Sequence, residues 1–539
     1  MYMKKRLTTI LALLLTLVGS AQAQNFESAK DAVKNMGVGW NLGNTLDANS
    51  GGAQGLESET YWGQPVTKPE LMKMMKEAGF GAIRVPVTWY NHMDADGKVD
   101  EAWMKRVHEV VDYVIKQDLY CIVNVHHDTG DGSQWLHAST TTYNKVKTKF
   151  EYLWKQIASE FKDYDQKLLF ESYNEMLDDN NRWNEPATDD GYKAINSYAK
   201  SFVTTVRNTG GNNKNRNLVV NVYSASSAPN AMKALELPEN TGHIIFQMHT
   251  YPNWQNESNA KREIDNLMSN IKSNLLNRAP VIIGEYATFT TWPSKIDYYD
   301  TNRKLALYAM EYLVKQAKAA GVATFYWMGL SDGIYRSEPA FNQADLAEVL
   351  TKAYHGSDFK GKYPVHDSSK KTVAFEGEKT LEWGQGVFIP SSMLTDVGEN
   401  VEVELTYTLN FTDYDDIQFM YNNGGWQKIP SGLSMDGKAF EGSDFSASSV
   451  YGIKSGDTKT SVLTFDASAY ALVSKYEMVI QGHGVIMKKV TVGAPSSPSA
   501  ISHAKADQTN DAIYNLAGQR VTNPQKGIYI RNGQKYIAK

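Results

Sequence analysis

Eight short apolar runs alternate with longer amphipathic stretches between Phe26 and His355, and this alternation restricts the possible folds more than any other feature of the sequence. Strands that alternate with helices form parallel sheets, and an eightfold repeat is typical of a sheet closed into a barrel. We therefore expect an α/β fold, a (β/α)8 TIM barrel. The expected strands are Gly37–Asn44, Ala82–Val87, Tyr120–His126, Lys167–Asn174, Asn217–Tyr223, Ile244–Thr250, Val281–Glu285 and Ala323–Met328.

Helical periodicity fills the stretches between these runs. The clearest boundaries surround residues 67–78, where Thr67 and Glu70 predict a capping box and Gly79 predicts the end of the helix. These patterns supply the helical half of the repeat. Further helices are expected at Glu101–Lys116, Tyr192–Asn208, Asn259–Asn274 and Thr301–Ala320.

The character of the sequence changes after His355. Residues 366–493 contain stretches that alternate apolar and polar residues, separated by Gly, Asn and Asp, with almost no helical periodicity. This pattern predicts a β-sandwich. A linker rich in Pro and Ser follows at 494–499, and residues 500–539 have a β-like pattern in which Asn532-Gly533 predicts a hairpin.

The N-terminus has the pattern of a secretory signal peptide. A basic start, MYMKKR, precedes an apolar run from Leu7 to Val18 and an A-x-A cleavage pattern that ends at Ala23. The run is too short to span a bilayer comfortably, so a signal peptide at 1–23 is favoured over a membrane anchor. We expect a secreted, periplasmic or cell-surface protein with no transmembrane segment in the mature chain.

Charge and cysteine content exclude several classes of partner and site. The chain of 539 residues has 55 Lys+Arg against 60 Asp+Glu and no long basic run, which argues against nucleic acid as a partner. Its single cysteine, Cys121, excludes an intramolecular disulfide and a zinc site built on cysteine. We expect a monomer.

Polar and aromatic residues end most of the predicted strands. In a barrel of this kind the carboxyl ends of the strands converge on one face, which is where active sites lie. These residues are therefore the candidate site. They are Asn44, Arg84, His126, His127, Asn174, Glu175, His249, Tyr251, Glu285 and Trp327.

Two of these residues, Glu175 and Glu285, are carboxylates on separate strands. Cleavage of a glycosidic bond needs such a pair, one as an acid and the other as a nucleophile or base. Alone, either could be a salt bridge at the rim of the barrel, and a single histidine could belong to the core, but the combination favours an active site. Adjacent residues in an extended segment cannot all face one ion, so His126, His127 and Asp128 predict a hydrogen-bonding set. We expect no metal and no cofactor.

Seven motifs carry a resemblance to a known family. In order they are GVGWNLGNTLDA, GFGAIRVPVTW, NVHHD, LLFESYNEM, QMHTYP, VIIGEYA and FYWMG. Together they resemble glycoside hydrolase family 5, of the retaining clan A of (β/α)8 hydrolases, and place its catalytic domain at 26–360. One departure is Met176, which stands where many members have proline. It affects a subfamily assignment more than the chemistry.

The resemblance implies roles for the site residues. Glu175 looks like the acid/base and Glu285 like the nucleophile. The other signature positions are Arg84, His126, Asn174, His249, Tyr251 and Trp327.

The implied function is that of a secreted endo-β-1,4-glucanase that acts on cellulose-type chains with retention of configuration. Xyloglucan, mixed-linkage glucan, mannan and xylan remain alternative substrates on the same barrel, because loops set the substrate preference. An inactive glycan-binding surface protein is the alternative from another class. The tail is similar to C-terminal segments of exported polysaccharide-degrading proteins of Bacteroidetes, some of which act in sorting to the cell surface.

The chemistry of these side chains supports the same roles. Arg84 and Tyr251 can donate to Glu285 and keep it ionised, whereas Glu175 is expected to be protonated near neutrality. Asn174 can reach the 2-hydroxyl of a sugar. A retaining mechanism predicts that the two carboxyl groups lie about 5 Å apart.

Aromatic residues outside this set have two interpretations. Trp62, Trp89, Trp135, Trp254 and Trp292 are either sugar platforms in loops or ordinary packing, and Trp40 is expected in the core. The β-rich region either binds glycan or serves as a structural spacer. Its candidate aromatic residues are Trp383, Tyr414, Tyr421, Trp426 and Tyr451.

Overall fold

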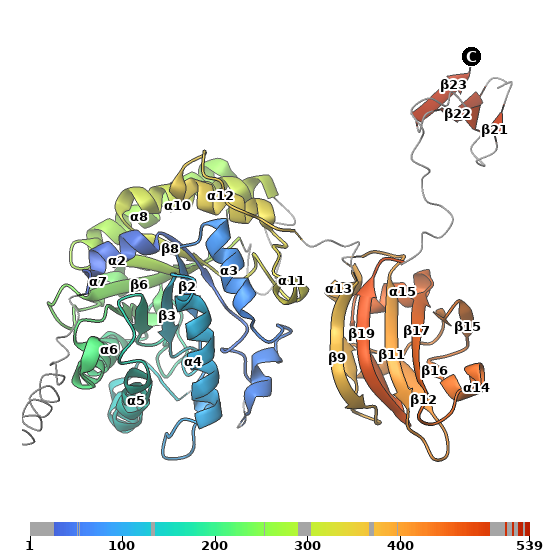
Figure 1. Ribbon diagram of the computed structural model, residues 1–539. Coiled ribbons are helices and arrows are strands. Elements are labelled where there is room, and N and C mark those ends of the chain that lie inside the picture. The colour runs from blue at the N-terminus through green and yellow to red at the C-terminus, as the bar shows by residue number, and fades with distance from the viewer. Residues whose placement is uncertain are drawn as a thin grey trace, which may run out of the picture. The chain divides into compact units, whose positions relative to one another are not determined.

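The computed structural model describes residues 26–365 and 371–495, except 51, 53, 131–134, 253, 289–302 and 396, and beyond them the backbone of four short strands (Figure 1). The chain divides into two compact units, Met1–His366 and Asp367–Lys539. The predicted signal peptide, residues 496–499 of the predicted linker, and Trp292 lie outside the described residues.

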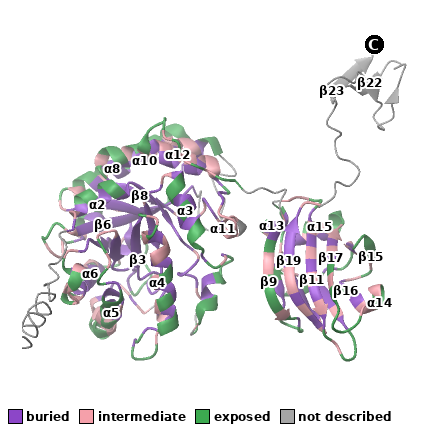
Figure 2. Cartoon of the chain, in the orientation of Figure 1, coloured by how far each residue is buried: buried purple, intermediate pink, exposed green. Residues whose placement is uncertain are grey.

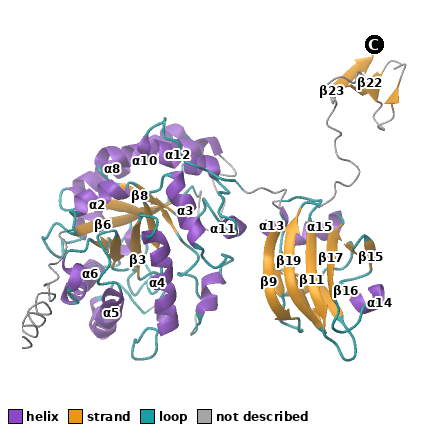
Figure 3. Ribbon diagram, in the orientation of Figure 1, coloured by secondary structure: helices purple, strands orange, loops and turns teal. Residues whose placement is uncertain are grey.

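A closed barrel of eight parallel strands forms the centre of the first unit, with β1 hydrogen-bonded to β8. The predicted (β/α)8 fold is confirmed, and helices surround the strands (Figure 3). Most strands end two or three residues earlier than predicted. They are β1 Val38–Asn41, β2 Ala82–Val85, β3 Tyr120–Asn124, β4 Leu168–Glu171, β5 Leu218–Asn221, β6 Ile244–Thr250, β7 Val281–Tyr286 and β8 Ala323–Tyr326.

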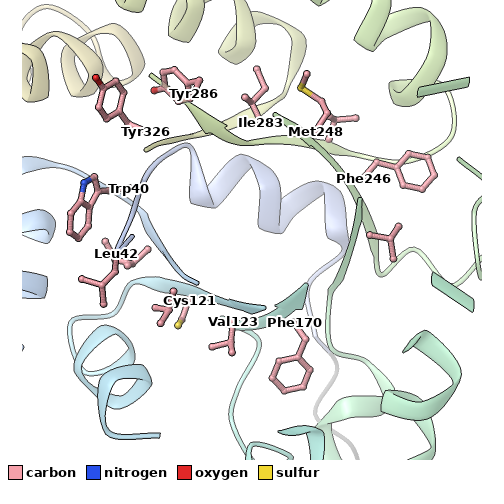
Figure 4. Packing of buried hydrophobic residues seen from close by; sticks show 14 of the residues in the cluster. Trp40, Leu42, Cys121, Val123, Phe170, Phe246, Met248, Ile283, Tyr286 and Tyr326 are labelled. Carbon is pink, nitrogen blue, oxygen red and sulfur yellow. The ribbon is translucent and has the colours of Figure 1, made fainter. Parts of the chain in front are cut away.

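Alternate residues of each strand face the surrounding helices. Cys121, Val123, Phe170 and Phe246 belong to this outward set, which forms the large buried cluster around the barrel (Figure 4). Trp40 also belongs to this core, as predicted. The helices are α3 Pro69–Ala78, α4 Glu101–Ile115, α5 Thr140–Glu160, α6 Asp190–Asn208, α7 Pro229–Ala234, α8 Glu257–Ile271, α10 Arg303–Ala320, α11 Ile334–Ser337 and α12 Ala344–His355.

The inside of the barrel is apolar toward the amino ends of the strands. Here helix α2, Ala29–Met36, packs Val33 and Met36 against strand residues that alternate with the outward set. This packing closes one end of the barrel and leaves the other end for a site. The strand residues of this floor are Ala82, Tyr120, Ile122, Leu169, Val219, Ile245, Ile282, Ala323 and Phe325.

The start of helix α3 corrects the predicted capping box. The N-cap is Lys68, which makes no side-chain cap bond, and Pro69 occupies the first turn. Thr67 instead donates its backbone N–H to Glu59 Oε1 at 2.8 Å. Proline fixes the backbone at a helix start without a capping side chain, which explains why the box is not used. Gly79 ends the helix in the left-handed conformation, as predicted.

Two antiparallel sheets form the described core of the second unit, which confirms a β-rich region after the barrel. The larger has the order β15-β14-β17-β11-β19-β9, and the smaller β10-β18-β12-β13 with β16 beside β12. Phe419 of the smaller sheet and Phe440 of the larger have ring centroids 6.0 Å apart, so their inner faces are in contact. Burial alternates along the strands (Figure 2).

The strands of the larger sheet are β9 Thr372–Thr380, β11 Glu402–Leu409, β14 Leu433–Met435, β15 Lys438–Phe440, β17 Thr458–Phe465 and β19 Val485–Gly493. Those of the smaller sheet are β10 Val387–Ile389, β12 Asp416–Asn422, β13 Trp426–Lys428, β16 Asp444–Phe445 and β18 Glu477–His483. Three short helices are α13 Ser391–Thr395, α14 Ala447–Tyr451 and α15 Ala467–Val473.

The C-terminal segment contains four short antiparallel strands in the order β21-β20-β22-β23. Arg531 of β22 lies opposite Gln534 of β23, the pairing expected for the predicted hairpin. The four strands of this segment are β20 Ile513–Tyr514, β21 Arg520–Val521, β22 Gly527–Arg531 and β23 Gln534–Ala538. None of the helices in the described part of the chain has the length and apolar character of a membrane span.

Candidate active site

A layer of buried polar side chains lies above the apolar floor of the barrel. Arg84, for example, follows Ala82 of the floor by two positions, so both side chains face inward. Barrels usually fill such a layer with branched apolar residues. The polar layer consists of Asn41, Arg84, Asn124, Glu171, Asn221 and Gln247, all 0% exposed. Buried polar groups are tolerated only where they are hydrogen-bonded. A polar layer in place of the usual apolar filling therefore indicates a functional site.

Arg84 connects this layer to a candidate carboxylate. Its Nε and Nη2 donate to Glu171 Oε2 and Oε1 at 2.6 and 2.8 Å, and its Nη1 donates to Glu285 Oε1 at 2.6 Å. Burial opposes the charge of Arg84, but Glu171 and then Glu285 outweigh it and raise the pKa of Arg84. Burial also opposes the charge of Glu171, yet Arg84 holds the pKa of Glu171 below its ordinary value. The guanidinium is therefore a fixed cation between two carboxylates.

A β-bulge turns Glu285 toward the barrel axis. In the pairing of β7 with β6, Glu285 lies opposite His249 and Gly284 is skipped. Because Ile282 faces the floor, strict alternation would point Glu285 outward, and the extra residue reverses this direction. A Cβ at Gly284 would lie 2.4 Å from Gln247 Cδ, so this position has room only for glycine.

Three neighbouring side chains contact Glu285. Besides Arg84, Tyr251 donates its hydroxyl to Oε2 at 2.6 Å, and His249 Nδ1 lies 3.6 Å from the same oxygen. Burial nevertheless raises the pKa of Glu285 above its ordinary value, and Glu175 adds to the increase. Arg84 and Tyr251, which the sequence predicted to keep Glu285 ionised, both limit this increase.

Glu175 approaches the same histidine. His249 Nδ1 lies 2.8 Å from Glu175 Oε1. Glu175, His249 and Glu285 each place one ligand-type atom within 4.8 Å of the others, so the nearest oxygens of the two carboxylates are no farther apart than that. The Glu175 side chain is 22% exposed and that of Glu285 is 5% exposed. Glu175 is therefore more open to solvent than Glu285.

The protonation of His249 follows from its neighbours. Burial lowers the pKa of His249 to about 4, so the ring is neutral at the pH of most assays. Gln247 Nε2 faces His249 Nε2 at 3.4 Å, which makes Nε2 the acceptor and places the proton on Nδ1. His249 then donates to Oε1 of Glu175.

His126 and Asn174 present two hydrogen-bond donors. Asn124 Nδ2 donates to His126 Nδ1 at 3.0 Å, which leaves the ring proton on Nε2, and burial holds the pKa of His126 well below its ordinary value. Asn174 Oδ1 accepts from Arg84 Nη2 at 2.8 Å, so its amide nitrogen remains as a donor, 3.4 Å from His126 Nε2. Two adjacent donors suit the hydroxyl oxygens of a sugar.

Trp327 adds a flat apolar surface next to these donors. It follows β8, is half-buried, and stacks on His126 with ring centroids 5.7 Å apart and planes 5° apart. A Cβ at Gly43 would lie 2.9 Å from the indole, so glycine leaves room for this ring. An aromatic face of this kind suits the apolar face of a pyranose.

Two predicted site residues lie outside this constellation. His127 Nε2 lies 3.6 Å from Asp47 Oδ2, and its ring meets the edge of Trp62 at 5.2 Å. Asn44 adopts a φ of 59° after the end of β1, a conformation that asparagine tolerates better than most residues. Both sit at the same end of the barrel, but the described contacts do not bring either of them to the carboxylates.

The loop tryptophans separate into packing and surface residues. Trp89 and Trp254 are 0% exposed, which makes them packing residues, and Trp135 is half-buried with its Nε1 donating to Asp128 Oδ1 at 2.7 Å. Trp62 is 40% exposed and remains a platform candidate. Trp183, which the sequence did not single out, is 46% exposed.

Within the described ranges of the chain, two groups of residues have the spacing of metal ligands. They are Glu175, His249 and Glu285, and Asp47, His126 and His127. In each group a histidine already contacts a carboxylate of the chain, at 2.8 Å for His249 and 3.6 Å for His127. That the site needs no metal therefore stays a prediction.

The sequence did not predict Glu171, Asn124 or Gln247 as part of the site. Asn124 and Glu171 are the last residues of β3 and β4, but the sequence predicted these strands to continue to His126 and Asn174, and Gln247 lies inside β6. The signal that could have found them is a polar residue at an inward position, two before a candidate residue on the same strand, as with Asn124 before His126 and Gln247 before His249.

Comparison with known proteins places this site in a family. The family described as Cellulase (glycosyl hydrolase family 5) matches residues 46–332. Endoglucanase B of Neocallimastix patriciarum is 34% identical over 373 residues, which cover 65% of this chain and 76% of that protein. Endoglucanase A of Ruminococcus albus is 36% identical over 350 residues, which cover 62% and 90%.

Solved structures agree with this assignment. A broad-specificity endoglucanase from an uncultured bacterium has a TM-score of 0.60 and 52% identity, covering 62% of this chain and 98% of that one. A family 5 glycoside hydrolase from Prevotella bryantii, in complex with a xyloglucan tetradecasaccharide, has a TM-score of 0.59 and 44% identity, covering 61% and 99%. The chain therefore belongs to glycoside hydrolase family 5 and is a glycoside hydrolase of the endoglucanase type.

Proposed function

We propose that the chain hydrolyses internal β-1,4 bonds of glucans with retention of configuration, with Glu285 as the nucleophile and Glu175 as the acid/base. The observation that carries this proposal is the pair of carboxylates, whose nearest oxygens lie within 4.8 Å and which share the neighbour His249. This spacing supports the retaining class, whose carboxyl groups lie about 5–5.5 Å apart, over the inverting class at about 6.5–9.5 Å.

The reaction proceeds in two displacements. In the first, a Glu285 oxygen bonds to the anomeric carbon while Glu175 gives its proton to the departing glycosidic oxygen. Because Oε1 of Glu175 accepts from His249, the transferred proton belongs to Oε2. In the second, Glu175 removes a proton from water, the water oxygen bonds to the anomeric carbon, and the bond to Glu285 breaks.

The surrounding residues prepare these steps. Arg84 and Tyr251 bind both oxygens of Glu285 and thereby fix its orientation. Asn174 and His126 are placed to donate to sugar hydroxyls, and hydrogen bonds to the 2-hydroxyl strengthen as positive charge develops on the ring. Trp327 supplies the apolar surface below the sugar. Asn44 and His127 are proposed to contact substrate farther from the bond that breaks.

Substrate preference is a further proposal. We place cellulose-type β-1,4-glucan first and xyloglucan second, because a structural relative with 44% identity binds a xyloglucan oligosaccharide. A panel of soluble cellulose derivative, xyloglucan, lichenan, glucomannan and xylan, with products separated by size, tests this order. We expect internal cleavage of the glucans and little activity on xylan. Release of short products only from chain ends, or activity confined to xylan or mannan, would contradict the proposal.

The hydroxyl of Tyr251 gives a pH prediction. Its donation favours the charged form of Glu285, so Tyr251→Phe should raise the pKa of Glu285 further. The acidic limb of kcat/KM, which reports the ionisation of the nucleophile, should move to higher pH, and kcat/KM should fall by about tenfold or more. Tyr286→Phe is the matched control, because its hydroxyl lies 3.3 Å from Thr324 Oγ1. An unchanged acidic limb in Tyr251→Phe would count against Glu285 as the titrating nucleophile.

We also propose that the barrel domain folds and acts without the β-rich region. Residues just beyond 360 belong to the barrel: Lys362 donates its N–H to Glu77 O at 3.0 Å, and Phe341 donates to Pro364 O at 2.8 Å. A chain that stops after Val365 should therefore be folded and should keep its kcat/KM on soluble substrate. A chain that stops after Lys360 should be less stable to heat. An inactive or insoluble product from the longer truncation would show that the barrel needs the β-rich region.

Three proposals concern the rest of the chain. We propose export by the signal peptide at 1–23, glycan binding by the β-rich region at 366–493, and a sorting role for the tail at 500–539. The first and third rest on sequence patterns alone. The second is supported by a difference between the outer faces of the two sheets.

A further inference from the structure

The outer faces of the two sheets in the β-rich unit carry different side chains. On the larger sheet, half-buried positions of β11 alternate with fully buried ones. Outward Thr406 and Thr408 pair with Thr460 and Thr458 at 2.9 and 2.7 Å, and Glu404 pairs with Lys371 at 2.7 Å. Threonines and ion pairs of this kind form an ordinary solvated face.

The smaller sheet presents aromatic side chains instead. Phe388 lies opposite Val479, and Trp426 lies opposite Asn422, on the face that points away from the larger sheet. Their rings are 5.6 Å apart, and Phe388 is 42% exposed. Phe419 occupies the opposite face of β12 and contacts the larger sheet. The aromatic pair is therefore not part of the sandwich core.

A third aromatic residue is held beside the same face. Trp383 is 48% exposed and lies in the turn between β9 and β10. The next residue, Gly384, donates its N–H to Gln481 Oε1 at 2.9 Å. Gln481 lies opposite Gln418 on the outward face and donates to it at 2.6 Å, and both are at least nine-tenths buried. A buried pair of amides thus fixes the turn that carries Trp383.

The face continues to the far end of β18. There Tyr414 is 49% exposed and its ring lies 4.5 Å from that of His483. His483 and Glu477 mark the two ends of the strand, which spans about 20 Å at about 3.3 Å per residue. Aromatic residues thus accompany the whole outward side of one strand.

We propose that this aromatic face, formed by Trp383, Phe388, Tyr414, Trp426, Gln481 and His483, binds an extended neutral β-glucan chain along β18. The inference deepens the glycan-binding role given above and rests on it. Flat aromatic rings suit the apolar faces of pyranoses, and the adjacent amides and carboxylates suit their hydroxyls. Lys428 is paired with Asp444 at 2.9 Å, which leaves Glu477 and Asp416 as a negative surplus on this face. That surplus disfavours acidic polysaccharides and nucleic acid.

Two aromatic residues predicted for a glycan face lie elsewhere. Tyr421 pairs with Met478, so it is on the inner side of the smaller sheet, and its ring contacts Tyr476 at 5.6 Å. The Lys459 ammonium of the larger sheet lies 4.1 Å from the ring of Tyr451. Neither belongs to the aromatic face.

The test measures partition of the full chain onto insoluble regenerated cellulose. All variants carry Glu175→Gln so that the substrate is not consumed. The double substitution Trp383→Ala and Trp426→Ala should weaken partition by about tenfold, since buried aromatic anchors dominate such interfaces. The double change to Phe should keep most of the binding. Tyr470→Ala on α15 is the matched control, because it removes an aromatic residue outside the aromatic face and should change nothing.

The same substitutions in the chain with Glu175 intact separate this inference from the enzymatic proposal. Cleavage of an aryl β-cellobioside should be unchanged, and hydrolysis of insoluble cellulose should fall. Unaltered partition of the double alanine variant would overturn the inference, as would an equal loss in Tyr470→Ala. A change from dimer to monomer in sedimentation, without a change in partition, would overturn it in favour of contact with a second copy. Absence of aryl cellobioside cleavage in the unsubstituted chain would contradict the proposed catalytic roles and leave the partition result standing.

Discussion

Replacing Glu285 by alanine is expected to lower hydrolysis of every β-glucan by at least about 10⁴-fold, as the loss of a catalytic nucleophile does in other enzymes. Glu285 is positioned by the bulge at Gly284 and by Arg84, and the other carboxylates described in the same network are Glu175 and Glu171. Glu171 is fully buried and is bound twice by Arg84, so it cannot replace the nucleophile. Initial rates on soluble cellulose derivative measure the effect.

Azide provides the internal check on this variant. With an activated aryl β-glycoside, azide can enter the space left by the Glu285 side chain and attack the anomeric carbon once, which gives an α-glycosyl azide. Glu311→Gln is the matched control, because this glutamate lies on the exposed side of α10 and should retain full activity. Activity of the Glu285→Ala variant within about tenfold of the unsubstituted chain would remove Glu285 from the mechanism.

Replacing Glu175 by glutamine should lower the cleavage of natural glucans by about 10²- to 10⁴-fold, the usual contribution of a general acid. The substitution keeps the shape of the side chain and its contact with His249 but removes the transferable proton. Aryl glycosides with a dinitrophenol leaving group need little protonation, so the first displacement should remain fast. The second displacement then lacks its base, and a burst of phenol followed by a slow steady state should appear in stopped-flow traces.

The anomeric configuration of the azide product distinguishes this variant from the previous one. Azide needs no general base, so it should accelerate the slow phase of Glu175→Gln and yield a β-glycosyl azide after two inversions. Full activity of the variant on unactivated polymer, or equal losses on natural and activated substrates, would show that Glu175 does not act as the acid.

The sequence predicted the upper layer of the site because two simple rules place it. Carboxyl ends of barrel strands converge, and residues at these ends, such as Glu175 and Trp327, are polar or aromatic where the strands themselves are apolar. The rules fail one layer below. Glu171 and Asn124 are the last residues of β4 and β3, but the sequence predicted both strands to end two or three residues later, so these polar residues fell inside the predicted strands.

The bulge at Gly284 is a second feature that periodicity cannot reveal. From alternation alone, Glu285 would face the helices, because Ile282 faces the floor of the barrel. The direction of Glu285 depends on tertiary pairing with β6 and on the close approach of Gln247 to Gly284.

Helix α5 shows the same limit at the level of secondary structure. It is 21 residues long, but its buried apolar residues begin only at Phe150, and its first half is polar and largely exposed. Amphipathic periodicity therefore covers only part of the helix, and the sequence patterns did not predict it. In the β-rich region the sequence predicted strands, but the division of its aromatic residues between core and outer face depends on the strand register.

The most direct measurement of the central claim is the mass of a trapped intermediate. A dinitrophenyl 2-deoxy-2-fluoro-β-cellobioside reacts with the nucleophile of a retaining glycosidase, and the fluorine slows the second displacement. We expect one fluorocellobiosyl group per chain, attached to the peptide that contains Glu285, with inactivation proportional to labelling and activity that returns when an acceptor sugar is added. Labelling of another residue, or inactivation without any covalent adduct, would contradict the assignment of Glu285 as the nucleophile.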